Sequence, residues 1–318
     1  MSESAEGLAG CEAIYSAGCA FSTEFCTQET GLAKAEIGII GGSGLYGMAG
    51  LTDVHEETVE TPFGAPSDPF VLGKLEGRDV AFLARHGKGH RILPSELNFK
   101  ANIFAMKKLG VTSILSVSAV GSLKEEHKPT DFVVPDQFID RTFDRTATFF
   151  GDGVVGHVGF GDPVCPIVVD VFVKACAEVG VVGKKGGTYV CMEGPQFSTR
   201  AESNLYRQWG ADIIGMTNLQ EAKLSREAEI SYATLAMVTD YDCWREGHDD
   251  VTIEQIIAVM HQNSGNAQKV VKAAVRLMPK DLSASPAQTA AKFAVMTDKS
   301  VIPAATKAKL DVLFGKYW

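Results

Sequence analysis

The chain has 318 residues, 45% of them hydrophobic, which is ordinary for a globular protein with a sizeable core. Its net charge of −9 and isoelectric point near 5.3 argue against nucleic-acid binding by bulk attraction, although a few local cations could still hold one anionic ligand. No apolar run approaches the roughly 18–20 residues that a membrane-spanning helix needs.

The N-terminal segment, residues 1–34, is rich in Gly, Ala, Ser and Glu and has no sustained hydrophobic period. We therefore expect a poorly ordered extension outside the core. The first basic residue is Lys34, so the segment lacks the basic start of a secretory signal. The seven cysteines include no Cys-x-x-Cys pair. This pattern predicts reduced thiols, no metal site and a cytoplasmic protein.

In the first part of the chain, residues that could bind an anion follow the predicted strands. A strand is expected at residues 36–40, and the glycine-rich residues 41–44 follow it, where backbone N–H groups and the Ser43 hydroxyl suit either a phosphate or a tight turn. Strands are also expected at 54–61, 70–75 and 80–84, the last two as a hairpin. Five of the seven residues at 85–91 are Arg, His or Lys. This loop suits an oxyanion, or it is simply solvated.

Helices and strands then alternate along the chain. Helices are expected at 94–109, 164–179, 198–209, 219–229 and 252–278, and strands at 112–118, 131–138, 187–192, 211–215 and 230–238. The small residues 118–122 are expected to form a turn at a strand end. Because no linker divides this alternation, we predict the α/β class, with a single domain at residues 35–318. It should contain a central mixed, twisted β-sheet flanked by helices and end in a helical extension.

Two acids follow the apolar run 232–238. Asp240 and Asp242 lie one residue apart, so in a strand their side chains project from the same side. They would lie just past its carboxyl end, where open α/β sheets place ligands. Two carboxyls beside Tyr241 and Trp244 could face the polar edge of a flat heterocycle. The alternative is a solvated loop with two ordinary acids.

Six motifs, in this order, resemble the trimeric purine nucleoside phosphorylase family. They are Gly-Ile-Ile-Gly-Gly-Ser-Gly (38–44), Ala-Arg-His-Gly (84–87), Ser-Ala-Val-Gly-Ser-Leu (118–123), Glu-Gly-Pro-Gln-Phe-Ser-Thr-Arg-Ala-Glu (193–202), Met-Thr (216–217) and Thr-Asp-Tyr-Asp-Cys-Trp (239–244). The resemblance covers about residues 36–275. It implies a homotrimeric enzyme that cleaves a purine nucleoside with inorganic phosphate as co-substrate, without a metal or an organic cofactor.

The same resemblance implies roles for particular residues. Those expected to bind phosphate are Ser43, Arg85, His86, Ser118, Ala119 and Thr217. Those expected to contact the nucleoside are Phe197, Ser198, Met216, Asp240, Asp242, Ile253, Ile256 and Ile257, together with His157 from the neighbouring subunit. Phe197 would stack on the purine or ribose. The isoleucines share one helix face, which is also the pattern of plain core packing, and a lone loop histidine is usually a surface residue.

The chemistry of the reaction explains the acids. The bond from ribose to purine breaks with oxocarbenium character, and the purine leaves more easily once its N7 is protonated. A carboxylic acid with a raised pKa can supply that proton. The role is expected of Asp240, with Asp242 orienting the 6-amino group, and the two roles could be exchanged. An ionised carboxylate would repel a 6-oxo group, so the acids favour a 6-amino purine.

The resemblance implies an apolar 5′ pocket at the isoleucines, and the reaction that it implies is phosphorolysis of S-methyl-5′-thioadenosine to adenine and 5-methylthioribose 1-phosphate. Two alternatives stay open. Gly215 stands where close family members carry Asn, which leaves a broader purine nucleoside phosphorylase acting on adenosine or inosine. A non-catalytic nucleotide-binding protein built on residues 41–44 would need a helix next and a ribose-binding acid about 20 residues on. Glu56, Glu57 and Glu60 lie at that distance, but the strand-like pattern there disfavours this role.

Overall fold

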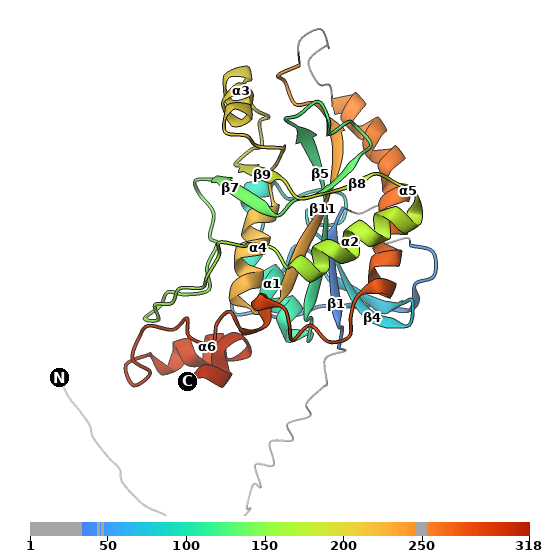
Figure 1. Ribbon diagram of the computed structural model, residues 1–318. Coiled ribbons are helices and arrows are strands. Elements are labelled where there is room, and N and C mark those ends of the chain that lie inside the picture. The colour runs from blue at the N-terminus through green and yellow to red at the C-terminus, as the bar shows by residue number, and fades with distance from the viewer. Residues whose placement is uncertain (1–33, 43–44, 46–47, 246–252) are drawn as a thin grey trace, which may run out of the picture. The chain divides into compact units, whose positions relative to one another are not determined.

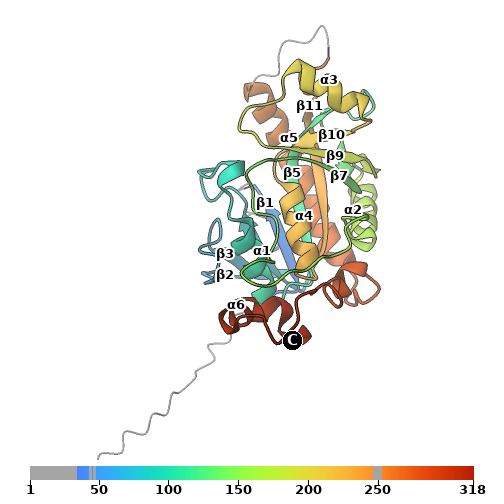
Figure 2. The same cartoon turned by 90° about the vertical axis from the view of Figure 1, so that its left-hand side faces the viewer.

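The computed structural model describes residues 34–42, 45, 48–245 and 253–318. Within them, eleven strands form one mixed sheet with helices on both sides, which confirms the predicted α/β class (Figures 1 and 2). Almost all of the expected N-terminal extension, and Ser43, lie outside the described residues. The boundary at residue 35 therefore stays a prediction.

One half of the sheet is built around β1 (Ile37–Gly41), which runs parallel to β4 (Arg78–Ala84) and β5 (Ser113–Ser122). All five residues of β1 are buried, as expected of a strand covered on both faces. β3 (Phe70–Leu75) pairs antiparallel with β4, which confirms the hairpin. β2 (Thr52–Glu57) pairs with β3 at the edge of the sheet.

The sheet forks at β5. Residues 113–121 of β5 pair in parallel with β11 (Ser231–Asp240), and residues 121–122 pair antiparallel with β10 (Ile213–Gly215). Beyond β10 lie β9 (Thr188–Met192) and β7 (Gln137–Arg141), and beyond β11 lie β6 (Phe132–Val134) and β8 (Gly183–Lys185). The turn expected at residues 118–122 is therefore wrong. These residues stay extended because β10 and β11 both supply them with partners.

Two other expected elements are broken in two. The strand expected at 131–138 is divided into β6 and β7 around Pro135, which lacks the N–H that a central strand needs. The helix expected at 94–109 is a 3₁₀ turn, η2 (Pro94–Glu96), followed by α1 (Phe99–Lys108). The Asn98 side chain accepts the N–H of Ala101 and starts α1 at that point.

The helices form the outer layers. α2 (Pro166–Val179) packs on α5 (Ile253–Leu277) on one side of the sheet, and α1 packs on α4 (Asn218–Glu227) on the other. α3 (Arg200–Gln208) and α6 (Ala304–Phe314) lie at opposite ends (Figures 1 and 2). Short turns at η3 (Pro286–Thr289) and η4 (Gly315–Tyr317) complete the chain. In the part of the chain that is described, no helix combines the length and the apolar character that crossing a bilayer requires.

Candidate active site

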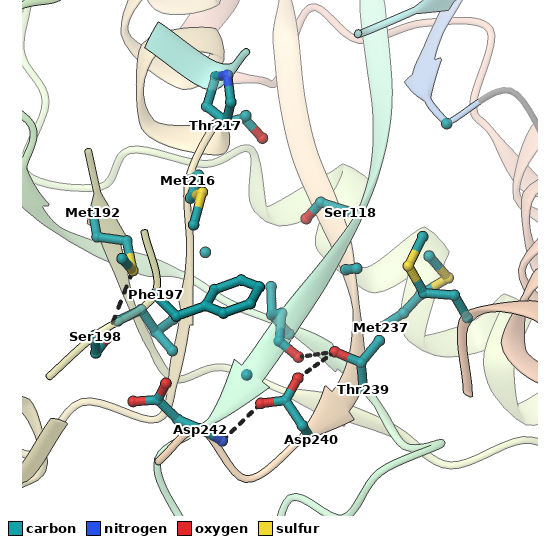
Figure 3. Close-up of a pocket in the computed structure, with 18 of the residues that line it drawn as sticks. Ser118, Met192, Phe197, Ser198, Met216, Thr217, Met237, Thr239, Asp240 and Asp242 are labelled. Carbon is teal, nitrogen blue, oxygen red and sulfur yellow. Dashed lines mark hydrogen bonds between the residues drawn. The ribbon is translucent and has the colours of Figure 1, made fainter. Parts of the chain in front are cut away.

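A cavity of about 590 Å³ lies where β5, β10 and β11 end, a volume typical of sites for small organic ligands. The carboxyl ends of strands are where α/β sheets usually bind ligands. The structure brings most of the predicted site residues to this cavity. They are Arg85, His86, Ser118, Ala119, Phe197, Ser198, Met216, Thr217, Asp240 and Asp242. Figure 3 shows the two acids at one end, Thr217 at the other, and the Phe197 ring between them.

Several predicted residues are not placed there. Ser43 and the side chains of Ile253 and Ile256 lie outside what the structure describes. Ile257 is 47% exposed and does not line the cavity, whereas Met260, nearly one turn further along α5, does line it. His157 is exposed and also lies away from the cavity of its own chain.

Arg85, directly after β4, is buried in the cavity wall and forms a double ion pair with Glu221 of α4. Its Nε lies 2.5 Å from Oε1, and Nη2 lies 3.2 Å from Oε2. The other donors reach the Val117 carbonyl at 2.9 Å and the Ser116 hydroxyl at 2.7 Å. Burial lowers the pKa of Arg85, but the Glu221 carboxylate more than offsets this, so the guanidinium stays charged. Within the described part of the chain, one Nη1 hydrogen is left for a ligand.

His86 stands next to Arg85. Its Nδ1 lies 2.8 Å from the carbonyl oxygen of Ile92, which can only accept, so Nδ1 carries the hydrogen. Burial, and then the charge of Arg85, lower the pKa of His86 to about 4. At neutral pH the ring is therefore uncharged, and Nε2 can accept a hydrogen bond.

The N-terminus of α4 reaches the same end of the cavity. Thr217 is the N-cap residue, and its side chain makes no capping bond. The partial positive charge at this helix end favours an anion. The Ser118 hydroxyl donates to Oδ1 of Asn218 at 2.7 Å, so it can only accept a hydrogen bond from a ligand. Arg85, Thr217 and the start of α4 make this end of the cavity suited to an oxyanion.

The acids are largely buried at the opposite end. Burial raises the pKa of Asp240, and it raises the pKa of Asp242 to about 6. Oδ1 of Asp240 accepts the N–H of Asp242 at 2.7 Å, and Oδ2 contacts the Thr239 hydroxyl at 2.7 Å. Oδ2 of Asp242 is buried, and the Ser203 and Ser198 hydroxyls lie near enough to this carboxyl to oppose part of the rise in its pKa.

The Thr239 hydroxyl can accept a hydrogen bond from Asp240 when Asp240 is protonated. Its Oγ1 lies within hydrogen-bond distance of both Asp240 Oδ2 and the Val120 carbonyl, the latter at 3.1 Å. A hydroxyl has one hydrogen, and a carbonyl oxygen can only accept. When Asp240 is protonated on Oδ2, it can donate to Thr239, whose own hydrogen then serves Val120. The arrangement thus tolerates a neutral Asp240.

The acids come together for a different reason than expected. β11 continues to Asp240, with a register shift after Val238, and Asp242 follows in a turn with φ of 52°. Strand alternation therefore does not place the second carboxyl. The turn does so, closed by the bond from the Asp242 N–H to Asp240. The expectation that both acids face one site holds, although its geometric argument was wrong.

Phe197 projects into the cavity from the loop between β9 and α3, and 56% of its surface is exposed (Figure 3). A large aromatic side chain in this position gains little from core packing and is suited to stacking on a flat ligand. We expect Phe197→Ala to raise KM for the nucleoside about 5- to 100-fold, the equivalent of losing ~1–3 kcal/mol of stacking. Because the ring is exposed, Tm should stay unchanged. Steady-state kinetics and calorimetry on the same preparation check this result, and a large fall in Tm would contradict it.

Some cavity residues were not predicted. His90, Met237, Thr239, Cys243 and Met260 also line the site. His90 stacks on His86 with ring centroids 4.4 Å apart, and its membership of the basic loop was the only signal for it. The sequence also gave no signal for Glu221, the partner of Arg85, or for Arg145, which is described below. The roles of both residues depend on contacts that are distant in sequence.

Gly215 does not leave the hole that its missing side chain suggests. A Cβ atom at this position would lie 2.0 Å from the Tyr189 hydroxyl. Tyr189 is fully buried on the neighbouring strand β9 and occupies the space. The space that the missing side chain would leave at Gly215 is therefore occupied by the Tyr189 side chain.

The described residues contain no group of three or more His, Cys, Asp or Glu side chains placed to hold a metal ion. The cysteines at positions 165, 176, 191 and 243 are free thiols.

This fold and site define a class of protein. Residues 36–276 match the family model described as Phosphorylase superfamily. The S-methyl-5′-thioadenosine phosphorylase of Koribacter versatilis is 65% identical over 285 residues, covering 90% of this chain and 97% of that protein. The enzyme of the same name from Geobacter sulfurreducens is 57% identical, covering 88% of this chain and 98% of that protein.

Solved structures agree with this result. The crystal structure of a methylthioadenosine phosphorylase from an antarctic soil metagenomic library superposes with a TM-score of 0.84 at 53% identity, covering 88% of this chain and 99% of that one. A mutant adenosine/methylthioadenosine phosphorylase from Schistosoma mansoni, in complex with methylthioadenosine, gives 0.74 at 33% identity, covering 88% and 98% of the two chains. The chain belongs to the phosphorylase superfamily and, within it, to the S-methyl-5′-thioadenosine phosphorylase family.

Proposed function

We propose that this protein cleaves S-methyl-5′-thioadenosine with inorganic phosphate, giving adenine and 5-methylthioribose 1-phosphate, a reaction of purine and methionine salvage. One observation carries the proposal. A single cavity has a cationic end at Arg85 and the start of α4, and a pair of acids with raised pKa at the other end. Relatives that share most of the chain have the same named activity.

Phosphate binds at the Arg85 end. The remaining Nη1 hydrogen of Arg85, the Thr217 hydroxyl and the N-terminus of α4 supply donors and positive charge. Neutral His86 accepts a P–OH hydrogen at Nε2. The bound anion faces the sugar carbon from the side opposite to the purine. It therefore stabilises the positive charge that develops on the sugar and then forms the new C–O bond.

Adenine leaves at the end that holds the acids. As the glycosidic bond breaks, electron density moves to the purine, and a carboxylic acid that protonates N7 turns the leaving group into a neutral base. Asp242 lines the cavity and has a pKa raised to about 6, which favours it as the proton donor. Asp240 then orients the 6-amino group. This is the exchanged form of the assignment expected from the sequence.

The roles of these residues need neither a metal nor an organic cofactor, because phosphate supplies the nucleophile and a carboxyl group supplies the proton. The net charge of −9 gives no reason to expect nucleic acid as a partner. The free thiols of the described residues fit a cytoplasmic location.

We also propose that the enzyme is a homotrimer in which His157 completes the 5′ side of a neighbouring cavity. The N–H of His157 donates to the Ala294 carbonyl, which joins two loops at an exposed apolar surface. On that surface Val155, Phe293 and Met296 are 55%, 85% and 68% exposed. Apolar side chains gathered in this way are typical of a subunit interface.

Mixed subunits test the shared site. His157→Glu should place a carboxylate against the apolar 5′ group, and Asp242→Asn should remove the acid, so we expect each variant alone to lose at least about 10-fold in activity. Co-expressed with two tags and purified as mixed trimers, they should regain about a third of wild-type activity, because every mixed trimer then has one intact site of its three. Mixed trimers without any gain would show that His157 acts within its own chain.

The reaction type is tested by following the phosphorus. With methylthioadenosine and phosphate, ³¹P NMR should show a sugar 1-phosphate formed in a one-to-one ratio with adenine. Adenine released at the same rate without phosphate would identify a hydrolase and contradict the proposal.

A further inference from the structure

Arg145 lies in the loop between β7 and α2, yet only 1% of its side chain is exposed. All five of its N–H groups have acceptors. Nε donates to Oε1 of Glu193 at 2.9 Å, and Nη1 donates to the Met216 carbonyl and, at 3.2 Å, to Oε1 of Gln220. Nη2 donates to the carbonyls of Met192, at 3.4 Å, and of Glu193. Such complete use of a guanidinium indicates a fixed structural link.

The acceptors belong to two segments that line the cavity. β9 and β10 run in parallel, and their last pair is Cys191 with Gly215. The carbonyls that follow on each strand, those of Met192 and Met216, no longer have a strand partner in this pair. Arg145 supplies donors to both and so extends the connection past the end of the sheet.

The two segments also touch directly. Gly194 has φ of 69°, and a Cβ atom there would lie 2.6 Å from the Met216 sulfur. The second carboxylate oxygen of Glu193 accepts the N–H of Phe143 at 2.6 Å, which ties the same segment to the Arg145 loop. The segment then continues to Phe197 and Ser198. Figure 3 shows Met192, Phe197 and Met216 along one side of the cavity.

We propose that Arg145 is a positioning residue that holds the nucleoside side of the cavity, and that its loss weakens nucleoside binding more than phosphate binding. The inference rests on the proposed function. Arg145 does not line the cavity, so it acts through the segments that it joins. The Arg85 part of the phosphate end is held separately, because Arg85 is fixed by Glu221 and Ser116. Arg145 reaches the other part only through the Met216 carbonyl, next to Thr217, and through Gln220 of α4.

The test is Arg145→Lys, which keeps the charge but has too few donors for the five acceptor groups. We expect KM for methylthioadenosine to rise about 10- to 100-fold, the range for losing one or two charge-assisted hydrogen bonds. KM for phosphate should rise less, by no more than about 3-fold, because Arg85 keeps its own partners. Glu193→Gln should also raise KM for methylthioadenosine more than KM for phosphate, but by a smaller factor than Arg145→Lys does. It keeps the test available if the arginine variant does not fold.

Arg78→Lys is the matched control. Arg78 also joins a carboxylate, that of Glu36, to a backbone carbonyl, that of Met278, but it lies at the start of β4, away from the cavity. It should lower Tm without changing either KM. Equal changes in both constants for Arg145→Lys, or none, would overturn the inference. If the wild-type protein itself neither cleaves methylthioadenosine nor binds adenine by calorimetry, it is the proposed function that fails.

Discussion

Replacing Asp242 with Asn is expected to lower kcat/KM for methylthioadenosine by about 10²- to 10⁴-fold, the usual contribution of a general acid. The amide fits the same space and tolerates the positive φ of this turn, but it has no proton to give. The loss should be greatest where the wild-type carboxyl is protonated. In the wild type, burial raises the pKa of Asp242 to about 6, so the rate should fall as pH rises through this region. The variant should lack this limb of the pH profile.

The same substitution should stabilise the fold at high pH. The folded pKa of Asp242 lies above its ordinary value of 3.8, so its stabilising contribution is complete below that value and is lost as pH rises through about 6. At pH 8 the wild type must keep an ionised carboxylate buried at position 242, whereas the variant has a neutral amide there. We therefore expect the free energy of unfolding of the variant to be about 1–3 kcal/mol higher. At pH 4 the difference should disappear.

Two measurements check these results: pH–rate profiles, and urea unfolding at pH 4 and pH 8. Asp170→Asn, on the exposed surface of α2, is the control and should change neither. Unchanged kcat for Asp242→Asn would remove this carboxyl from the reaction. The acid would then be sought in Asp240.

Glu221→Ala should have the largest effect on stability. It leaves the Arg85 charge buried without a partner, which costs about 3–5 kcal/mol. Oε2 of Glu221 also accepts hydrogen bonds from Ser116 at 2.8 Å and from Tyr232 at 2.9 Å, so further donors lose their acceptor. A displaced guanidinium should raise KM for phosphate, and Glu221→Gln, which keeps the volume, should raise it with less loss of stability.

Urea unfolding and the phosphate dependence of the rate measure the two effects. The control is Glu178→Ala, which removes an exposed ion pair with Arg276 and should cost no more than about 1 kcal/mol. A loss of stability for Glu221→Ala as small as that of the control would show that the buried pair is not holding Arg85.

The sequence predicts the regular elements well where a local pattern decides them. The buried strand β1 and the β3–β4 hairpin follow from apolar runs and a turn, and both are present. The hydrophobic pattern of the sequence fails where pairing with neighbouring strands determines the structure. β5 continues beyond residue 118 because two other strands pair with it, and the short β8, with two lysines, exists because β6 lies beside it. No local signal contains this information.

The site divides in the same way. The acids, the basic loop and Phe197 have distinctive chemistry, and the structure places them in one cavity. Arg145 and Glu221 are ordinary charged residues in the sequence, and their importance comes from burial against segments about 50 to 140 positions away. On α5, the cavity contact that the structure describes is Met260. A helical period identifies a face, but the approach of the helix determines which turn meets the ligand.

The most direct test of the central claim is one assay on three nucleosides. Methylthioadenosine, adenosine and inosine are each incubated with the enzyme, with and without phosphate, and release of the free base is followed. We predict that adenine appears fastest from methylthioadenosine and only when phosphate is present. Equal or faster cleavage of adenosine would contradict the apolar 5′ side, and preference for inosine would contradict the assignment of Asp240 and Asp242 to a 6-amino purine.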